Sequence, residues 1–315
     1  MVQIITDSST LYTEQEAQRS GFEAVPLCIS IGDYHGRDLQ VDMEEYYRKI
    51  ADGHIPLSSQ PPIGDVVDCY EKYAGSEIIN ISMADGLSGT YQSACSARET
   101  VDHKDQITVF NSRTLCGPHR YMVEMAQKLK EEGKNASEIL EWLRQKADQT
   151  ESFLIPQDFS FLKRGGRLTP VAAALGSVLK LKPIMCLTRD GKRLDKFAVK
   201  RTMTAAVKCI LDYLKERELG AEHILYISHA NALEDAKKIR DLFAEACQGL
   251  EIHILELSPA SVSRRHALPR LLFRVRIPSL PEDISNSPRR ALAAAIRPCS
   301  LSILFVCSAC ASPVF

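Results

Sequence analysis

The chain has 315 residues, of which 45 % are hydrophobic and 25 % are charged. These fractions are typical of globular proteins and leave room for two ordinary domains, so they exclude a disordered chain, collagen and a coiled coil. Lysine and arginine total 39 against 40 acidic residues, and this balance offers no global attraction for nucleic acid or an anionic membrane. The first residues resemble a strand rather than a signal peptide, so we expect a cytoplasmic protein whose ten cysteines are mostly reduced.

Strands and helices alternate through the first half of the chain, which is typical of α/β layers with a largely parallel sheet. In chain order we expect a strand at residues 4–5, a helix from a capping box at 13–16 to Gly21, a strand at 22–31, helices at 41–51 and 63–73, a strand at 77–83, a helix at 88–100, a strand at 106–110, and helices at 117–131 and 138–149. Asn135 and Glu138 form a second capping box. We place the end of this N-terminal α/β domain near residue 150.

The second half predicts a mixed α/β domain over residues 151–260. The expected elements are a short helical segment at 159–163, a turn at 165–166, a helix at 170–179, strands at 183–188 and 193–199, a helix at 202–218, a strand at 223–228, a helix at 233–247 and a strand at 251–257. Asp190-Gly191 is the strongest hairpin signal in the chain and requires an antiparallel pair. The predicted fold class is therefore α/β with two domains, the second one mixed.

The composition changes abruptly near residue 260. Residues 261–315 contain eight arginines, six prolines and nine serines, but no lysine and no glycine. This break suggests a frameshifted or fused end, so we expect the second domain to be incomplete and residues 261–315 to form a poorly ordered tail. The apolar stretch 299–315 is shorter than the roughly twenty residues that span a bilayer, so no stable membrane insertion is expected.

Four motifs carry polar groups suited to binding an anion. They are Thr6-Asp7-Ser8-Ser9, Ser58-Ser59-Gln60, Asp85-Gly86-Leu87-Ser88-Gly89-Thr90, and Lys163-Arg164-Gly165-Gly166-Arg167-Leu168-Thr169. Hydroxyls, backbone N–H groups at a helix N-terminus and arginine forks all favour carboxylate or phosphate. Each motif also has a plain structural interpretation, as a capping turn, a surface loop, a helix cap or a solvated turn.

The sequence motifs of other common functional sites are absent or incomplete. Ser88 lacks the G-x-S-x-G pattern of a nucleophile elbow, and the chain has no phosphate-binding loop and no dinucleotide fingerprint. Cys307 and Cys310 have the spacing of metal ligands but no second pair, so no metal site is expected. His119 and His229 are single histidines, which are more often structural residues than ligands.

Taken together, the four motifs resemble the DegV family of bacterial lipid-binding proteins, over residues 1–259. The segment 171–183 is similar to the small-residue helix and following strand of that family. The resemblance implies a two-domain α/β protein that holds one long-chain fatty acid in an apolar tunnel, without a cofactor and without catalytic activity of its own. It also implies a partner, the ATP-binding subunit of fatty acid kinase, to which the carboxylate is presented for acyl-phosphate formation.

The resemblance also implies roles for individual residues. Ser58 and Ser88 would bind the carboxylate, supported by Ser59 and the backbone near Gly89. The rim cations that meet the kinase subunit would be Arg167 and Arg201, with Arg164 a further possibility. The tunnel would be lined by the aliphatic residues Leu162, Leu168, Leu175, Val178 and Leu179, which could equally be plain core.

One departure from the family lies at the end of the second domain. Family members continue with a His-x-Gly-Pro-Gly turn whose histidine also contacts the carboxylate, whereas His266 here has neither glycine, so we assign it no role. Two alternatives to a lipid-binding subunit therefore stay open. One is an enzyme on a related scaffold, either a phosphotransferase or a hydrolase that depends on Ser88, and the other is a folding-impaired remnant of the family.

Overall fold

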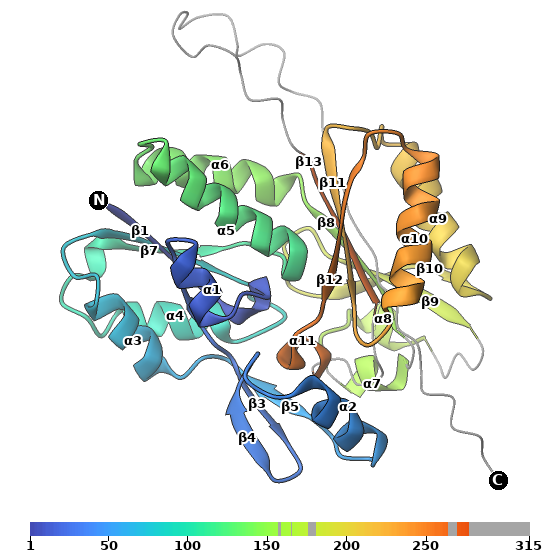
Figure 1. Ribbon diagram of the computed structural model, residues 1–315, viewed down its shortest axis with the longest axis horizontal. Helices are drawn as coiled ribbons and strands as arrows, with labels where there is room; N and C mark the ends of the chain where they lie inside the picture. The colour runs from blue at the N-terminus through green and yellow to red at the C-terminus, as the bar shows by residue number, and fades with distance from the viewer. Residues whose placement is uncertain (157–158, 165, 176–180, 264–269, 277–315) are drawn as a thin grey trace, which may run out of the picture.

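The computed structural model describes residues 1–156, 159–164, 166–175, 181–263 and 270–276 (Figure 1). They form a four-stranded parallel sheet, a six-stranded mixed sheet and a small three-stranded antiparallel sheet. Helices flank both large sheets. This arrangement confirms the predicted α/β fold class.

The parallel sheet has the strand order β2-β1-β6-β7. Its strands are β1 (Val2–Asp7), β2 (Glu23–Val25), β6 (Glu77–Ser82) and β7 (Ile107–Asn111). The helices that connect and flank them are α1 (Glu14–Arg19), α3 (Ile63–Glu71), α4 (Thr90–Arg98), α5 (Cys116–Glu131) and α6 (Ala136–Asp148), with short 3-10 turns η1 (Ser8–Thr10) and η2 (Lys104–Gln106). The capping boxes predicted at Thr13 and Asn135 are both present.

Alternation along β1 divides the core of this sheet between two faces. Ile4 packs in a cluster with Met122 of α5 and Leu143 of α6, whereas Ile5 packs with Val66 of α3 and residues of α4. Successive side chains of a strand point to opposite faces, so a continuous apolar strand is buried on both sides.

The single strand expected at residues 22–31 is wrong, because two strands in different sheets occupy that stretch. Pro26 lies between β2 and β3 (Cys28–Ile31), and a proline cannot donate a backbone hydrogen bond to a continuing ladder. The chain instead turns into the small sheet, whose order is β4-β3-β5. Its other elements are β4 (Tyr34–Arg37), β5 (Leu57–Ser59) and the intervening helix α2 (Met43–Ala51).

The second large sheet has the order β10-β9-β8-β13-β11-β12, with β11 and β12 parallel and the other neighbours antiparallel. Its strands are β8 (Glu151–Ile155), β9 (Lys182–Leu187), β10 (Leu194–Lys200), β11 (His223–His229), β12 (Glu251–Glu256) and β13 (Arg270–Arg276). The helices of this part are α7 (Phe159–Arg164), α8 (Pro170–Ala173), α9 (Met203–Lys215), α10 (Leu233–Ala246) and α11 (Pro259–Ser263). The hairpin predicted at Asp190-Gly191 joins β9 to β10.

The structure departs from the sequence prediction at residues 270–276. We expected residues 261–315 to be a poorly ordered tail, yet β13 lies inside the sheet and pairs with both β8 and β11. Without it, the facing edges of β8 and β11 would leave backbone groups unpaired, which a buried sheet does not tolerate. The rest of the expected tail, apart from α11, lies outside the described residues.

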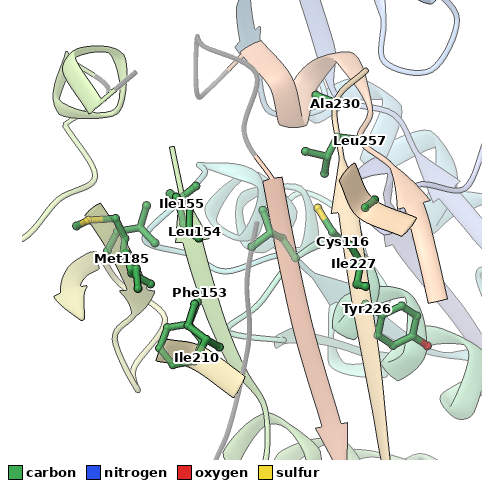
Figure 2. Packing of buried hydrophobic residues seen from close by; sticks show 14 of the residues in the cluster. Cys116, Phe153, Leu154, Ile155, Met185, Ile210, Tyr226, Ile227, Ala230 and Leu257 are labelled. Carbon is green, nitrogen blue, oxygen red and sulfur yellow. The ribbon is translucent and has the colours of Figure 1, made fainter. Parts of the chain in front are cut away.

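The core continues across the predicted boundary near residue 150. One large cluster joins Leu27 and Leu87 of the first part to Phe153 and Ile210 of the second, and Figure 2 shows a portion of it. Helix α5 approaches β11 so closely that a Cβ on Gly117 would collide with Tyr226. The two sheets are therefore packed through α5, with α9 and α10 on the far side of the mixed sheet (Figure 1).

Candidate functional site

The polar motif at the end of β1 organises the edge of the parallel sheet. The carboxylate of Asp7 accepts hydrogen bonds from Ser9 N and from Met83 N, both at 2.9 Å. It thereby ties the end of β1 to the segment that follows β6. Asp7 is only 2 % exposed, so its role is to hold neighbouring strand ends together rather than to meet solvent.

His119 is a structural residue, as the sequence suggested. Its Nε2 lies 2.9 Å from Ile81 O, while its Nδ1 lies 2.9 Å from the hydroxyl of Ser9. Complete burial lowers the pKa of His119 below its usual range, although the nearby Asp7 carboxylate opposes this. Both ring nitrogens already have hydrogen-bond partners, so we assign the ring a structural role.

The loop between β6 and α4 carries Ser88, which is only 4 % exposed. Its hydroxyl lies 2.7 Å from that of Thr90 and accepts a hydrogen bond from Thr90 N at 3.2 Å. The helix begins at Thr90 rather than at Ser88 as predicted, and Gly89 is its N-cap without a side-chain hydrogen bond. Ser88 therefore stabilises the turn that precedes α4 and accepts a hydrogen bond from the first N–H group of that helix.

The Ser58-Ser59-Gln60 segment, expected to be a loop, lies in β5 and just beyond it. Ser58 pairs with Ile29 and Ser59 with Cys28, and directly paired residues share a face of a sheet. Ile29 is buried whereas Cys28 is half-buried, so Ser58 lies on the inner face and Ser59 on the outer face. The two hydroxyls therefore cannot serve one ligand together.

The structure brings this strand to the start of α4. The Ser93 hydroxyl donates to Pro61 O at 3.1 Å. A Cβ on Gly89 would lie 3.0 Å from Gln60 Oε1. Two motifs that are about thirty residues apart in sequence are thus neighbours in the structure.

Helix α11, which lies late in the chain, contacts the small sheet and its neighbouring residues. Ala260 N donates to Asp38 Oδ1 at 2.9 Å, and the hydroxyl of Tyr46 donates to Pro259 O at 2.9 Å. The second oxygen of Asp38 accepts from Ser8 at 2.7 Å. Burial raises the pKa of Asp38 to about 6, although these donors oppose the shift. Helix α11 also packs against β3 and β5, so it lies beside Ser58.

Sequence reasoning did not identify Asp38 and Tyr46 as part of this region. Both residues lie far from α11 in the chain, and no local pattern connects them to it. The only available signal was the acidic residue that follows β4, which also fits an ordinary turn.

The three predicted arginines do not form one cluster. The backbone of Arg167 lies beside the start of β10, where its carbonyl accepts from Leu194 N at 2.8 Å, whereas Arg201 follows the other end of that strand. The intervening residues span roughly 20 Å at 3.3 Å per residue. Arg164 is the last residue of α7, and its side chain lies outside the described part of the chain.

The expected tunnel is described only in part. Leu162 and Leu168 are buried in the large core cluster, and Leu175 packs partly buried against it. Val178, Leu179 and His266 lie outside the described residues. A cavity of about 700 Å³ lies elsewhere, bounded by Phe153, Phe197 and Tyr213, and it contains none of the predicted carboxylate residues.

Several further expectations concern cysteines, metals and membranes. The seven cysteines within the described ranges are all free thiols. Among the same residues, no group of three or more histidine, cysteine or acidic side chains could hold a metal ion. No helix of the described chain is both long enough and apolar enough to cross a membrane. Cys307 and Cys310 lie outside these ranges.

Comparisons with known proteins show which family and which solved structures this chain resembles. A family model described as "Uncharacterised protein, DegV family" matches residues 1–264. A DegV domain-containing protein of Staphylococcus aureus is 29 % identical over 250 residues, which cover 77 % of this chain and 87 % of that protein. A DegV family protein from Thermus thermophilus, described for fatty acid binding, has a TM-score of 0.78 at 25 % identity and covers 88 % of this chain and 99 % of its own. DegV from Bacillus subtilis, described as a fatty acid binding protein, has a TM-score of 0.77 at 25 % identity, with 87 % of this chain and 99 % of that chain covered.

Proposed function

The chain belongs to the DegV family, and from this membership we propose that it binds one long-chain fatty acid, with the carboxylate held between Ser58 and Ser88. Relatives from Thermus thermophilus and Bacillus subtilis are described as binding fatty acid. The observation that supports the proposal is that Gln60 and Pro61, which follow β5, lie beside the start of α4, so the two serine motifs are neighbours. Ser59 pairs with Cys28 on the outer face, so in this proposal it does not contact the carboxylate.

Hydroxyl groups and helix N–H groups suit a carboxylate that must remain accessible. They donate hydrogen bonds to the oxygens without a fully buried ion pair, whose desolvation would be costly. Most of the affinity then comes from the acyl chain, at about 0.8 kcal/mol per buried methylene. The acyl chain would follow Leu162 of α7 and Leu168, which lies between α7 and α8, and both side chains are buried.

The protein acts together with a second subunit in this proposal. The carboxylate is presented to an ATP-binding fatty acid kinase subunit in the bacterial cytoplasm, and that subunit forms the acyl phosphate. Arg167 and Arg201 meet the partner at two separate points, since they lie at opposite ends of β10. The chain itself supplies binding and orientation and needs no cofactor.

Native mass spectrometry of the purified full-length chain, followed by denaturing extraction, tests the binding proposal. We expect a mass increment of one fatty acid per chain and a long-chain acid in the extract. Adding a bacterial fatty acid kinase subunit and ATP should then produce acyl phosphate. A chain that carries no lipid and takes up neither palmitate nor oleate would overturn the proposal.

A further inference from the structure

One hairpin contacts both the loop that leads to Ser88 and the segment that contains Arg167. Residues 188–193, the tip between β9 and β10, are here called the hairpin tip. On one side the tip meets the loop that leads to Ser88, and on the other it meets the segment that contains Arg167.

The contact with the Ser88 loop involves both side chains and backbone. Lys192 forms an ion pair with Asp85, whose side chain is only 12 % exposed. Next to it, a Cβ on Gly86 would collide with the backbone carbonyl and Cα of Lys192. Because the obstructing atoms belong to the main chain, a rotation of one side chain could not relieve the collision.

The hairpin tip is internally braced. Lys192 N and the hydroxyl of Thr188 both donate to Asp190 Oδ1, at 2.9 Å and 2.6 Å. Gly191 has a φ of +70°, and a Cβ there would lie 2.8 Å from Arg113 Cα. The tip is therefore held by its own hydrogen bonds and packs closely against Arg113 of the first part of the chain.

On its other side, the tip residue Arg193 and the next residue, Leu194, bind the backbone of the segment that contains Arg167. Leu194 N donates to Arg167 O at 2.8 Å, and Thr169 N donates to Leu194 O at 2.8 Å. The guanidinium of Arg193 donates to Leu168 O at 3.4 Å. These bonds transmit any shift of the hairpin to the backbone around Arg167.

Only two residues separate Asp85 from Ser88, and the turn between them is tight. Leu87 N donates to Ala84 O at 3.0 Å, and Ser88 N donates to the same oxygen at 3.3 Å. Asp85 N also donates to Asn111 Oδ1 at 3.4 Å. A displacement at Gly86 therefore moves Ser88 rather than being absorbed by a flexible loop.

We infer that the hairpin tip is a positioning element that sets the Ser88 hydroxyl relative to the Arg167 segment and so determines selectivity for an ionised carboxylate over a neutral headgroup. This inference rests on the proposed function and adds residues to it. Gly86, Asp85 and Lys192 act through Ser88 and do not touch the ligand. Their effect falls on the headgroup end, because none of them belongs to the apolar residues proposed to hold the acyl chain.

The test compares palmitate with hexadecanol, which has the same chain length and no charge. The variant is Gly86→Ala, whose only direct consequence is the collision with the Lys192 backbone. The matched control is Gly64→Ala in α3, where a Cβ meets nothing within 4 Å. Dissociation constants for both lipids and the unfolding temperature are measured for each protein.

We expect Gly86→Ala to weaken palmitate binding about tenfold and hexadecanol binding much less, so that selectivity for the acid falls. Gly64→Ala should leave both constants and their ratio unchanged. If Gly86→Ala does not fold, Asp85→Asn, Lys192→Met and the double variant are compared, and a coupling seen with palmitate but not with hexadecanol supports the inference.

Equal weakening of both lipids would assign the tip a general structural role and overturn the inference. Selective palmitate binding by the wild type that none of these variants alters would overturn it while leaving the proposed function intact. A wild-type chain that binds neither lipid would overturn the proposed function and this inference with it.

Discussion

Ser58 and Ser59 are neighbours in β5, but their hydroxyls lie on opposite faces of the small sheet. We therefore expect Ser58→Ala to weaken palmitate binding about tenfold or more, because a hydrogen bond to an ionised group contributes about 1.5–3 kcal/mol. Ser59→Ala should leave the affinity unchanged. Displacement of a fluorescent fatty acid measures both, and a larger loss in Ser59→Ala would place the ligand on the outer face.

Ser88 combines a local and a proposed ligand role, since its hydroxyl already contacts Thr90. Ser88→Ala should weaken palmitate binding about tenfold. The control is Ser96→Ala, an exposed serine of α4, the helix that follows Ser88. We expect unchanged binding for this control in the same displacement assay. Equal affinities of the two variants would show that the start of α4 does not hold the carboxylate.

The lowered pKa of His229 leads us to expect a loss of stability in acid. Burial lowers the pKa of His229 to about 4 from the usual 6.5. Between pH 6.5 and pH 4 this histidine is protonated in the unfolded chain and neutral in the folded chain. Its contribution to the free energy of unfolding is therefore present above pH 6.5 and is lost as the pH falls toward 4. Asp38 acts in the opposite direction, because its pKa of about 6 lies above the ordinary 3.8.

The variant His229→Gln separates the two groups. Urea unfolding of wild type and variant should be compared at pH 7 and pH 4.5. We expect the free energy of unfolding of the wild type to fall relative to that of the variant as the pH is lowered. A difference between the two proteins that is the same at both pH values would contradict a neutral, buried His229.

At the scale of elements, α11 depends on the first part of the chain through Tyr46 and Asp38. Tyr46→Phe removes the hydrogen bond to Pro259 O and leaves that buried carbonyl without the donor. We expect a loss of about 1–3 kcal/mol in the free energy of unfolding. Tyr34→Phe is the control, since no described contact gives the Tyr34 hydroxyl a hydrogen bond, and equal losses in both variants would contradict the α11 contact.

Elements whose signals are local could be predicted from the sequence. The capping boxes at Thr13 and Asn135 and the hairpin at Asp190-Gly191 all depend on residues within a few positions of one another. The prediction of one strand at residues 22–31 is wrong because Pro26 interrupts the hydrogen-bond ladder, although the apolar pattern continues past it. The hydrogen bond from Ala260 N to Asp38 joins residues that are more than two hundred positions apart, and no local pattern encodes such a contact.

At the scale of the whole molecule, contacts between distant residues determine both the geometry of the site and the structure of residues 270–276. The motifs identified the polar segments that contain Ser58, Ser88 and Arg167, but the loop predicted at Ser58 is wrong, because that residue lies in β5. They also did not predict that β5 would turn Ser59 outward or that β10 would hold Arg167 and Arg201 apart. Strand pairing decides both, and pairing depends on partners elsewhere in the chain. The composition break near residue 260 likewise gave no sign that residues 270–276 would enter the sheet.

Two truncations test whether β13 is an integral strand. A chain ending at residue 263 keeps α11 but lacks β13, whereas a chain ending at residue 278 keeps both. The shorter chain exposes the facing edges of β8 and β11 and loses backbone hydrogen bonds to both. At about 1 kcal/mol for each bond, the expected cost is 5 kcal/mol or more, comparable with the whole stability of a domain.

We therefore expect the shorter chain to aggregate or to unfold without a cooperative transition, because unpaired strand edges also invite association. The longer chain should match the full-length protein in unfolding temperature and palmitate binding. Thermal unfolding with size-exclusion chromatography checks both. A shorter chain as stable and monomeric as the longer one would mean that residues 270–276 are dispensable, and the second sheet would then have to close between β8 and β11 without them.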